Sequence, residues 1–168
     1  MLKEKVDKLV DKYLDEVISI RRHIHQNPEL SLKEFETSKF VANELRKIGL
    51  EAQEGVGKTG VVSNLNLGKG EKTLMLRADM DALPIQEETG LPFSSKNPGV
   101  MHACGHDIHT SILLGVTKVL NGIKDEINGN VKFVFQPAEE NNPVGGAPLM
   151  IKEGVLENPH VDNAVALH

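Results

Sequence analysis

The stretch MHACGHDIHT, residues 101–110, concentrates side chains that could bind a metal. It contains the only cysteine of the chain, three histidines and an aspartate. Thiolate, imidazole and carboxylate groups are the ligands of Zn²⁺, Mn²⁺ and similar cations. Cys104 and His106 are two positions apart, so on an extended segment both side chains point to the same side. The stretch predicts a cation site just before a helix, with a buried structural cysteine beside solvated histidines as the alternative.

Two pairs of carboxylates each follow an apolar, strand-like segment. Asp79 and Asp81 come after TLMLRA, and Glu139 and Glu140 come after VKFVF. In α/β folds, ligand sites lie at the carboxyl ends of the strands, so we expect both pairs at one edge of a sheet. One glutamate could hold a metal while its neighbour takes a proton from metal-bound water. The alternatives are turn-forming aspartates before Pro84 and a solvated pair of glutamates.

The composition is typical of a single globular domain. The chain has 168 residues, 39% hydrophobic and 26% charged, with a formal net charge of −5, and this is enough to form a sizeable core. Lysines and arginines are scattered among acidic residues, which argues against a nucleic-acid surface. No apolar run approaches the roughly 18 residues of a membrane span, and the N-terminus lacks the apolar core of a secretory signal. The single cysteine excludes an internal disulfide, and we expect a cytoplasmic protein.

Hydrophobic periodicity predicts strands that alternate with helices. We expect helices over residues 2–26, 109–123 and 147–153, and a further helix that follows a cap at residues 31–34, carries the apolar residues from 35 to 48 and ends at residue 49. Strands are expected over residues 50–54, 60–67, 73–77, 131–135 and 163–167. A turn at residues 68–72 and a loop at 141–146 join some of these elements. This order predicts an α/β fold, a three-layer αβα sandwich with a mostly parallel mixed sheet. The glycine-rich stretch 54–60 lacks the ending of a phosphate loop, so we interpret it as a strand connection.

Three local predictions concern the helices. His23 and His25 lie near the end of the first helix, where a cation suits the helix dipole, and we expect both to be partly exposed. Ser31 and Glu34 have the spacing of a capping box for the second helix. The third helix is expected to bury Ile112, Leu113, Val116, Val119 and Leu120.

The motifs LRADMDALP, HACGHDIHT, FQPAEE and VALH, in this order and spacing, closely resemble those of the metal-dependent amidohydrolases. That family includes aminoacylases, hippurate hydrolases, N-acetyldiaminopimelate deacetylases and plant auxin-conjugate hydrolases. The opening RRHIHQNPELSLKEFET resembles the N-terminus of the family, so the likeness covers essentially the whole chain. Several motifs matched in order are a more specific signal than any one of them alone.

The resemblance implies roles for individual residues. A site for two divalent metal ions would take ligands from Cys104, His106, Glu140 and His168. Glu139 matches the general base that activates the bridging water, and Asp81 matches an aspartate that orients a ligand. Asp79 stands where relatives carry a histidine, and its role stays open. The cysteine favours Zn²⁺, with Mn²⁺, Co²⁺ or Ni²⁺ as alternatives.

The activity that the resemblance implies is hydrolysis of the amide bond of an N-acyl amino acid, for example an N-acetyl or N-benzoyl one. A dipeptidase or aminoacyl carboxypeptidase, or a truncated metal-binding fragment without activity, are the alternatives. Members of the family continue past the position of His168 into a lid or dimerisation domain and then complete the catalytic domain. We therefore expect residues 1–168 to be the N-terminal part of a catalytic domain. Its uncovered sheet edge and apolar helix faces favour either association, for example into a homo-oligomer, or instability.

Overall fold

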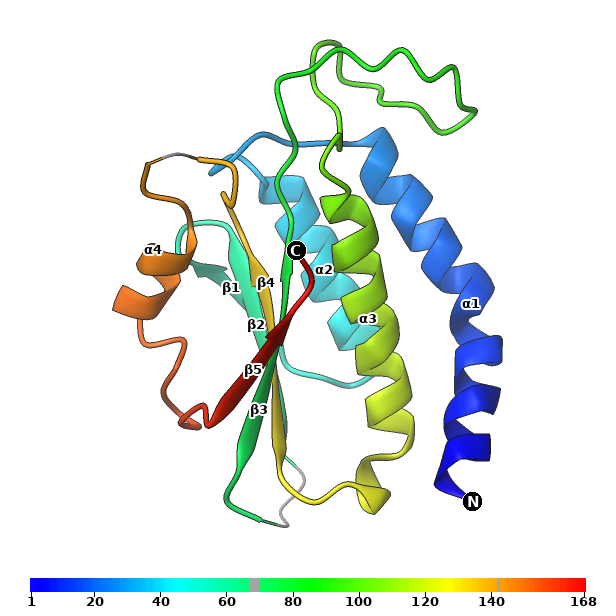
Figure 1. Ribbon diagram of the computed structural model, residues 1–168, viewed down its shortest axis with the longest axis vertical. Helices are drawn as coiled ribbons and strands as arrows, with labels where there is room; N and C mark the ends of the chain where they lie inside the picture. Colours follow the sequence, from blue (N-terminus) through cyan, green and yellow to red (C-terminus); the bar gives the residue numbers. More distant parts are fainter. Residues whose placement is uncertain (67–69, 142) are drawn as a thin grey trace.

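The computed structural model describes residues 1–66, 70–141 and 143–168, which form one sheet with flanking helices (Figure 1). The helices are α1 (Leu2–Gln26), α2 (Phe35–Lys47), α3 (His106–Gly122) and α4 (Ala147–Lys152), with a 3₁₀ turn at Lys124–Glu126. The strands are β1 (Gln53–Val56), β2 (Gly60–Asn66), β3 (Thr73–Asp79), β4 (Asn130–Gln136) and β5 (Asn163–Ala166). Each helix and strand that the periodicity predicted is present.

The sheet is mixed, with the strand order β1-β2-β4-β3-β5. β1 pairs with β2 and β2 pairs with β4 in antiparallel orientation, whereas β4 with β3 and β3 with β5 are parallel. Figure 1 shows α1, α2 and α3 on one face of this sheet and α4 on the other. The predicted αβα architecture with a mixed sheet is confirmed, but the described sheet is not mostly parallel, since two of its four strand pairs are antiparallel. Its parallel pairs lie together in the half of the sheet formed by β4, β3 and β5.

Two apolar clusters hold the layers together. The larger one joins α1, α2 and α3 to the sheet through side chains such as Leu45, Leu114 and Phe133, all fully buried. The smaller one lies on the opposite face, where Met150 of α4 packs against Val62 and Val134. β4 is the central strand, and the burial of nearly all its residues explains the apolar side chains of Val131, Phe133, Val134 and Phe135.

The carboxyl ends of three strands meet at one edge of the sheet. In the parallel pair of β3 and β4, Asp79 lies opposite Gln136, and in the pair of β3 and β5, Arg77 lies opposite Ala166. The segments that follow these strands therefore emerge side by side. The first turn of α3 lies at the same edge, because the His106 side chain is 2.9 Å from the carbonyl oxygen of Asp81. The fold thus gathers all the predicted site segments in one place.

Some element boundaries differ from the prediction. α3 begins at His106 and not at residue 109, because Gly105 adopts a left-handed φ of 87° that directs the chain into the helix. β1 begins at Gln53 and not at residue 50. Residue 67 of the predicted second strand, residues 68 and 69 of the predicted turn and residue 142 of the predicted loop lie outside the described residues. The glycine-rich stretch is confirmed as a strand connection, since it forms the β1–β2 hairpin.

The predicted capping box of the second helix is wrong. Glu34 is the residue before α2, but its side chain does not cap the helix. The carboxylate of Glu29 does so instead, because it accepts hydrogen bonds from the backbone N–H groups of Glu36 and Thr37. The Ser31 hydroxyl donates instead to the carboxylate of Asp81, and the Glu34 carboxylate accepts from Thr59 and from the backbone N–H of Ala138. Ser31 and Glu34 therefore form hydrogen bonds with residues far away in the chain, and not with the helix end that their spacing suggested.

The buried face of α3 is more polar than predicted. Leu113 is buried, but Ile112 is 41% exposed and the other three predicted core residues are only half-buried. Thr117 and Lys118 are buried in their place, and Lys118 forms an ion pair with Glu44 across the α2–α3 contact. Within the described ranges, no helix is both long enough and apolar enough to cross a membrane.

Candidate metal centre

Cys104, His106 and Glu140 form a group of potential metal ligands. One donor atom from each residue lies within 4.8 Å of the donor atoms of the other two. Cys104 is exposed, Glu140 is partly buried and His106 is 1% exposed. The predicted extended segment is wrong, because Gly105 is left-handed and His106 already belongs to α3. The two side chains nevertheless converge, since the turn at Gly105 brings them round to the same glutamate.

Hydrogen bonds to Asp81 orient the His106 imidazole. Its Nδ1 atom is 2.9 Å from the Asp81 carbonyl oxygen and 3.3 Å from a carboxylate oxygen of the same residue. A proton on Nδ1 leaves the lone pair of Nε2 free for a cation. Burial alone would lower the pKa of His106, but the bond to Asp81 and the charges of Asp79 and Asp81 raise it above its usual value. Carboxylates around this imidazole thus favour a positive charge there.

A network of carboxylates fixes the turn that carries Glu139 and Glu140. The Asp81 carboxylate accepts hydrogen bonds from the backbone N–H groups of both glutamates, each at 3.0 Å. Ala138 precedes them with a positive φ of 52°, and its N–H donates to Glu34 at 2.8 Å. Three successive N–H groups are therefore bound by two buried carboxylates. Such bonds hold a strained backbone in one conformation.

The same hydrogen bonds keep Asp81 ionised. Burial acts to raise its pKa, but bonds from His106, Ser31 and the N–H groups of Glu140 and Glu139 outweigh burial and lower the pKa to about 2. A carboxylate that accepts several hydrogen bonds is stabilised in its charged form. Asp81 can therefore hold the turn and His106 together over the whole physiological pH range.

Glu139 and His168 lie beside each other at the edge of this group. The Glu139 side chain is 23% exposed, and one of its oxygens is 3.9 Å from Nε2 of His106. His168 is 78% exposed, and its Nδ1 atom is 3.6 Å from the other carboxylate oxygen of Glu139. The structure thus brings five of the six predicted site residues close together and places His168 next to Glu139, outside the group formed by Cys104, His106 and Glu140.

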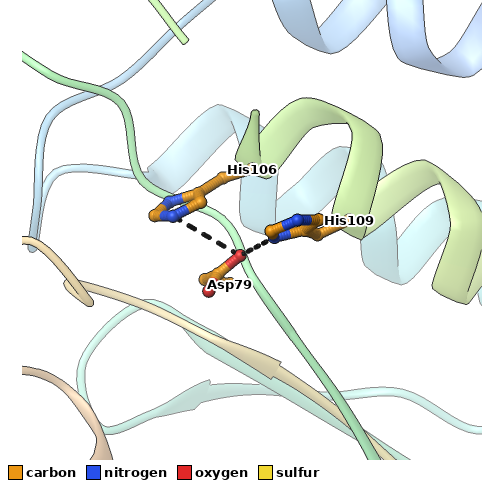
Figure 2. A group of neighbouring side chains, drawn as sticks. All are labelled: Asp79, His106 and His109. Atoms are coloured by element: carbon orange, nitrogen blue, oxygen red, sulfur yellow. Dashed lines mark hydrogen bonds and ion pairs between the residues drawn. The ribbon is translucent and has the colours of Figure 1, made fainter. Parts of the chain in front are cut away.

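Asp79 is the centre of a second, inner group. Figure 2 shows the imidazoles of His106 and His109, both from α3, directed towards its carboxylate. Oδ1 of Asp79 is 2.7 Å from Nδ1 of His109 and 3.6 Å from Nε2 of His106. Oδ2 accepts a hydrogen bond from Arg77 at 2.8 Å. Asp79, His106 and His109 also satisfy the distance requirement for a metal site, so His106 is shared by two groups.

The charges around the outer group, which consists of Cys104, His106 and Glu140, favour the binding of a cation. Desolvation, a hydrogen bond to Glu140 and the negative charges of Glu139, Glu140 and Asp79 raise the pKa of the Cys104 thiol to about 11. Negative charge that has accumulated around a thiol disfavours its ionisation, and a bound cation reverses this effect. The donor set of one thiol, one imidazole and one carboxylate is also the mixture that Zn²⁺ and related ions accept.

Sequence reasoning missed several residues that support the site. The spacing of Ser31 and Glu34 suggests a helix cap, and the stretch 101–110 includes His109 without giving it a role. The contacts that these three residues make join segments far apart in the chain, which no local pattern shows. Arg77 gave a local signal, because it is the one charged residue in the apolar stretch 73–78. A charged side chain in such a strand needs a partner at the strand end.

The prediction of partial exposure is wrong for His25. Its side chain is 3% exposed and lies 2.8 Å from a carboxylate oxygen of Asp107, the residue after His106. Its other ring nitrogen is 3.2 Å from Glu87 in the long loop before the cysteine. Arg21 forms an ion pair with Asp107 at 2.7 Å. The end of α1 therefore anchors both the first turn of α3 and the loop.

The sequence and the structure match proteins of known families. Residues 75–168 match the family described as Peptidase family M20/M25/M40. The chain is 51% identical to "Thermostable carboxypeptidase 2" of Saccharolobus solfataricus, covering 99% of this chain and 42% of the relative. It is 46% identical to "N-acyl-L-amino acid amidohydrolase" of Geobacillus stearothermophilus, covering 100% of this chain and 45% of the relative.

A solved structure shares the fold. The YXEP protein of Bacillus subtilis, described as a dinuclear metal binding peptidase from M20 family, superposes with a TM-score of 0.87 at 40% identity, covering 94% of this chain and 43% of that one. The chain thus spans less than half of the length of the curated relatives and of this structure.

Proposed function

The chain belongs to peptidase family M20/M25/M40, and on this premise we propose that the protein hydrolyses the amide bond of an N-acyl amino acid with the help of bound divalent cations. The observation that carries the proposal is the convergence of Cys104, His106 and Glu140 beside the carboxylate of Glu139. Residues 1–168 are, in this proposal, the N-terminal part of the catalytic domain.

Cys104, His106 and Glu140 are proposed to hold a cation, and His168 is proposed as a further ligand in a site for two ions. Zn²⁺ or Mn²⁺ suits these donors, and Co²⁺ or Ni²⁺ could replace them. When bound, such ions supply Lewis acidity, which polarises the amide carbonyl and makes a water molecule more acidic. Asp81 orients His106 and fixes the turn with Glu140, so the ligands are held in place before a cation arrives.

Glu139 is proposed as the general base. Its backbone is fixed by Asp81, while its side chain remains partly exposed and extends to 3.9 Å from the free nitrogen of His106. Its carboxylate would take the proton from the attacking water and pass it to the nitrogen of the leaving amine. The Glu139 side chain is 23% exposed and its neighbour His168 is 78% exposed, so solvent reaches this carboxylate.

The substrate class follows from what two relatives have in common. One is named an N-acyl-L-amino acid amidohydrolase and the other a carboxypeptidase. Both names describe cleavage of an amide whose nitrogen belongs to an amino acid with a free carboxylate. The similarity to the carboxypeptidase makes hydrolysis of dipeptides or of the last peptide bond the second candidate function. In both cases the partner is a small molecule or short peptide.

Substitution of the base in the whole protein tests the proposal. Glu139→Gln should lower kcat for N-acetyl and N-benzoyl amino acids by at least about 100-fold, because general-base catalysis contributes that much. Exposed Glu51→Gln is the matched control and should keep full activity. Normal turnover by Glu139→Gln would contradict the proposed role. Faster cleavage of dipeptides than of any N-acyl amino acid would favour the second candidate.

A further inference from the structure

The Arg77 guanidinium contacts the ends of three strands. On β3 it donates to Oδ2 of Asp79 at 2.8 Å, on β4 to the side chain of Gln136 at 2.9 Å, and after β5 to the carbonyl oxygen of Leu167 at 3.1 Å. Arg77 can make all three contacts because β3 lies between β4 and β5 in the sheet. Its side chain is 11% exposed. The guanidinium is thus a fixed positive charge beside the inner group.

The inner and outer groups compete for one nitrogen. Nε2 of His106 is 3.6 Å from Asp79 and 3.9 Å from Glu140, while the other ring nitrogen is engaged by Asp81. A neutral imidazole nitrogen has a single lone pair, so it can ligate only one cation. A metal ion at His106 must therefore lie either with Asp79 and His109 or with Cys104 and Glu140.

Arg77 makes binding of a cation at the inner group unfavourable. The buried Asp79 carboxylate is already neutralised by the guanidinium and bound by His109. A divalent ion on the same carboxylate would lie close to the positive charge of Arg77 in a poorly solvated place, where repulsion is strong. The three residues of the outer group include no such cation, and the Glu139 carboxylate adds a negative charge 3.9 Å from Nε2 of His106.

We propose that Arg77 is a positioning residue. By forming an ion pair with Asp79, it directs the cation to Cys104, His106 and Glu140. The inference rests on the metal site of the proposed function. Without the guanidinium, the buried Asp79 carboxylate keeps its contact with His109 but loses its ion pair with Arg77, so it binds a divalent cation more readily. The ion then moves inwards to Asp79, His106 and His109, and Cys104 is left without it.

Cobalt absorption tests the inference without any measurement of turnover. Co²⁺ bound to a thiolate gives a sulfur-to-metal charge-transfer band in the near ultraviolet, whereas nitrogen and oxygen ligands do not. The 168-residue chain should show this band when loaded with Co²⁺. Arg77→Met should still bind Co²⁺ but lose most of the band. Arg46→Met, which removes an exposed arginine of α2, is the matched control and should keep it.

A second substitution separates charge from structure. Arg77→Met with Asp79→Asn removes the inner carboxylate as well, so the thiolate band should return, although the bonds to Gln136 and Leu167 are still missing. If Arg77→Met does not fold, Arg77→Gln removes the charge while keeping a hydrogen-bond donor, and the same loss and recovery are expected. A full band in the single variant, or no recovery in the double variant, would overturn the inference. A wild-type chain that shows no band would overturn the proposed metal site as well.

Discussion

Asp81 is the residue whose loss should affect the candidate site most without removing a ligand. Asp81→Asn leaves one carbonyl oxygen where two carboxylate oxygens now bind Ser31 and the N–H groups of both glutamates. Loss of a residue that orients metal ligands weakens metal affinity by about 10- to 100-fold. Titration calorimetry with Zn²⁺ measures this change, and Asp125→Asn on the exposed 3₁₀ turn is the control. Unchanged affinity would mean that the turn keeps its shape without Asp81.

Glu34 makes stability depend on pH. Burial, the largest effect, raises its pKa despite the hydrogen bonds from Thr59 and Ala138. A carboxyl group whose folded-state pKa is raised stabilises the fold below its unfolded pKa of about 4.3, and this stabilisation is lost as the pH rises through the folded-state pKa.

Glu34→Gln cannot ionise and still offers an oxygen to the N–H of Ala138. The stability of this variant relative to wild type should therefore increase between about pH 4 and about pH 7. Urea unfolding at both pH values measures the difference. The exposed Glu51→Gln should show no such trend. An equal difference between Glu34→Gln and wild type at both pH values would contradict the account of Glu34.

At the scale of the elements, a buried lysine joins β4 to the segment between α4 and β5. Lys132 is 1% exposed, and its ammonium donates to the carbonyl oxygens of Val155, Glu157 and Pro159 at 2.7–2.9 Å. Lys132→Met keeps the apolar stem but leaves these carbonyls without their donor. We expect a loss of about 3 kcal/mol in the free energy of unfolding, since each unsatisfied group costs roughly 1–3 kcal/mol.

Chemical denaturation of the variant measures this loss. Lys124→Met, on the exposed 3₁₀ turn, is the matched control and should change the free energy of unfolding by less than about 0.5 kcal/mol. If Lys132→Met were as stable as the control, the three carbonyl contacts would not stabilise the fold.

The sequence was sufficient to predict the elements and where the site lies among them. Apolar spacing predicted α1 from residue 2 to residue 26, as the structure has it, and strand ends predicted where Asp81 and Glu139 meet. The hydrogen bonds of Ser31 and Glu34 could not be predicted, because their partners are far away in the chain. The local sequence is equally consistent with a capping box formed by the same two residues. The burial of His25 depends in the same way on Asp107 and Glu87.

At the scale of the whole molecule, apolar surface remains uncovered. β5 is an edge strand with all four residues exposed, including Val165 at 58%. Val10, Leu14 and Ile112 line an apolar groove of about 310 Å³ between α1 and α3. Open strand edges and apolar patches promote association. We expect the 168-residue chain on its own to associate as its concentration rises.

A charge on the open edge should reduce this association. Val165→Lys adds a lysine to β5, the device with which natural edge strands avoid pairing. Val144→Lys adds the same charge to another exposed valine, at 56%, and is the matched control. Sedimentation velocity over a range of concentrations should show a more monomeric Val165→Lys chain. Equal association of both variants would place the contact elsewhere on the surface.

X-ray absorption at the zinc edge tests whether Cys104, His106 and Glu140 hold one cation. The zinc-loaded chain should show a sulfur ligand at about 2.3 Å together with nitrogen and oxygen ligands at about 2.0–2.2 Å. Cys104→Ser should lose the sulfur contribution and keep the others. A zinc spectrum of the wild-type chain without sulfur would contradict the account.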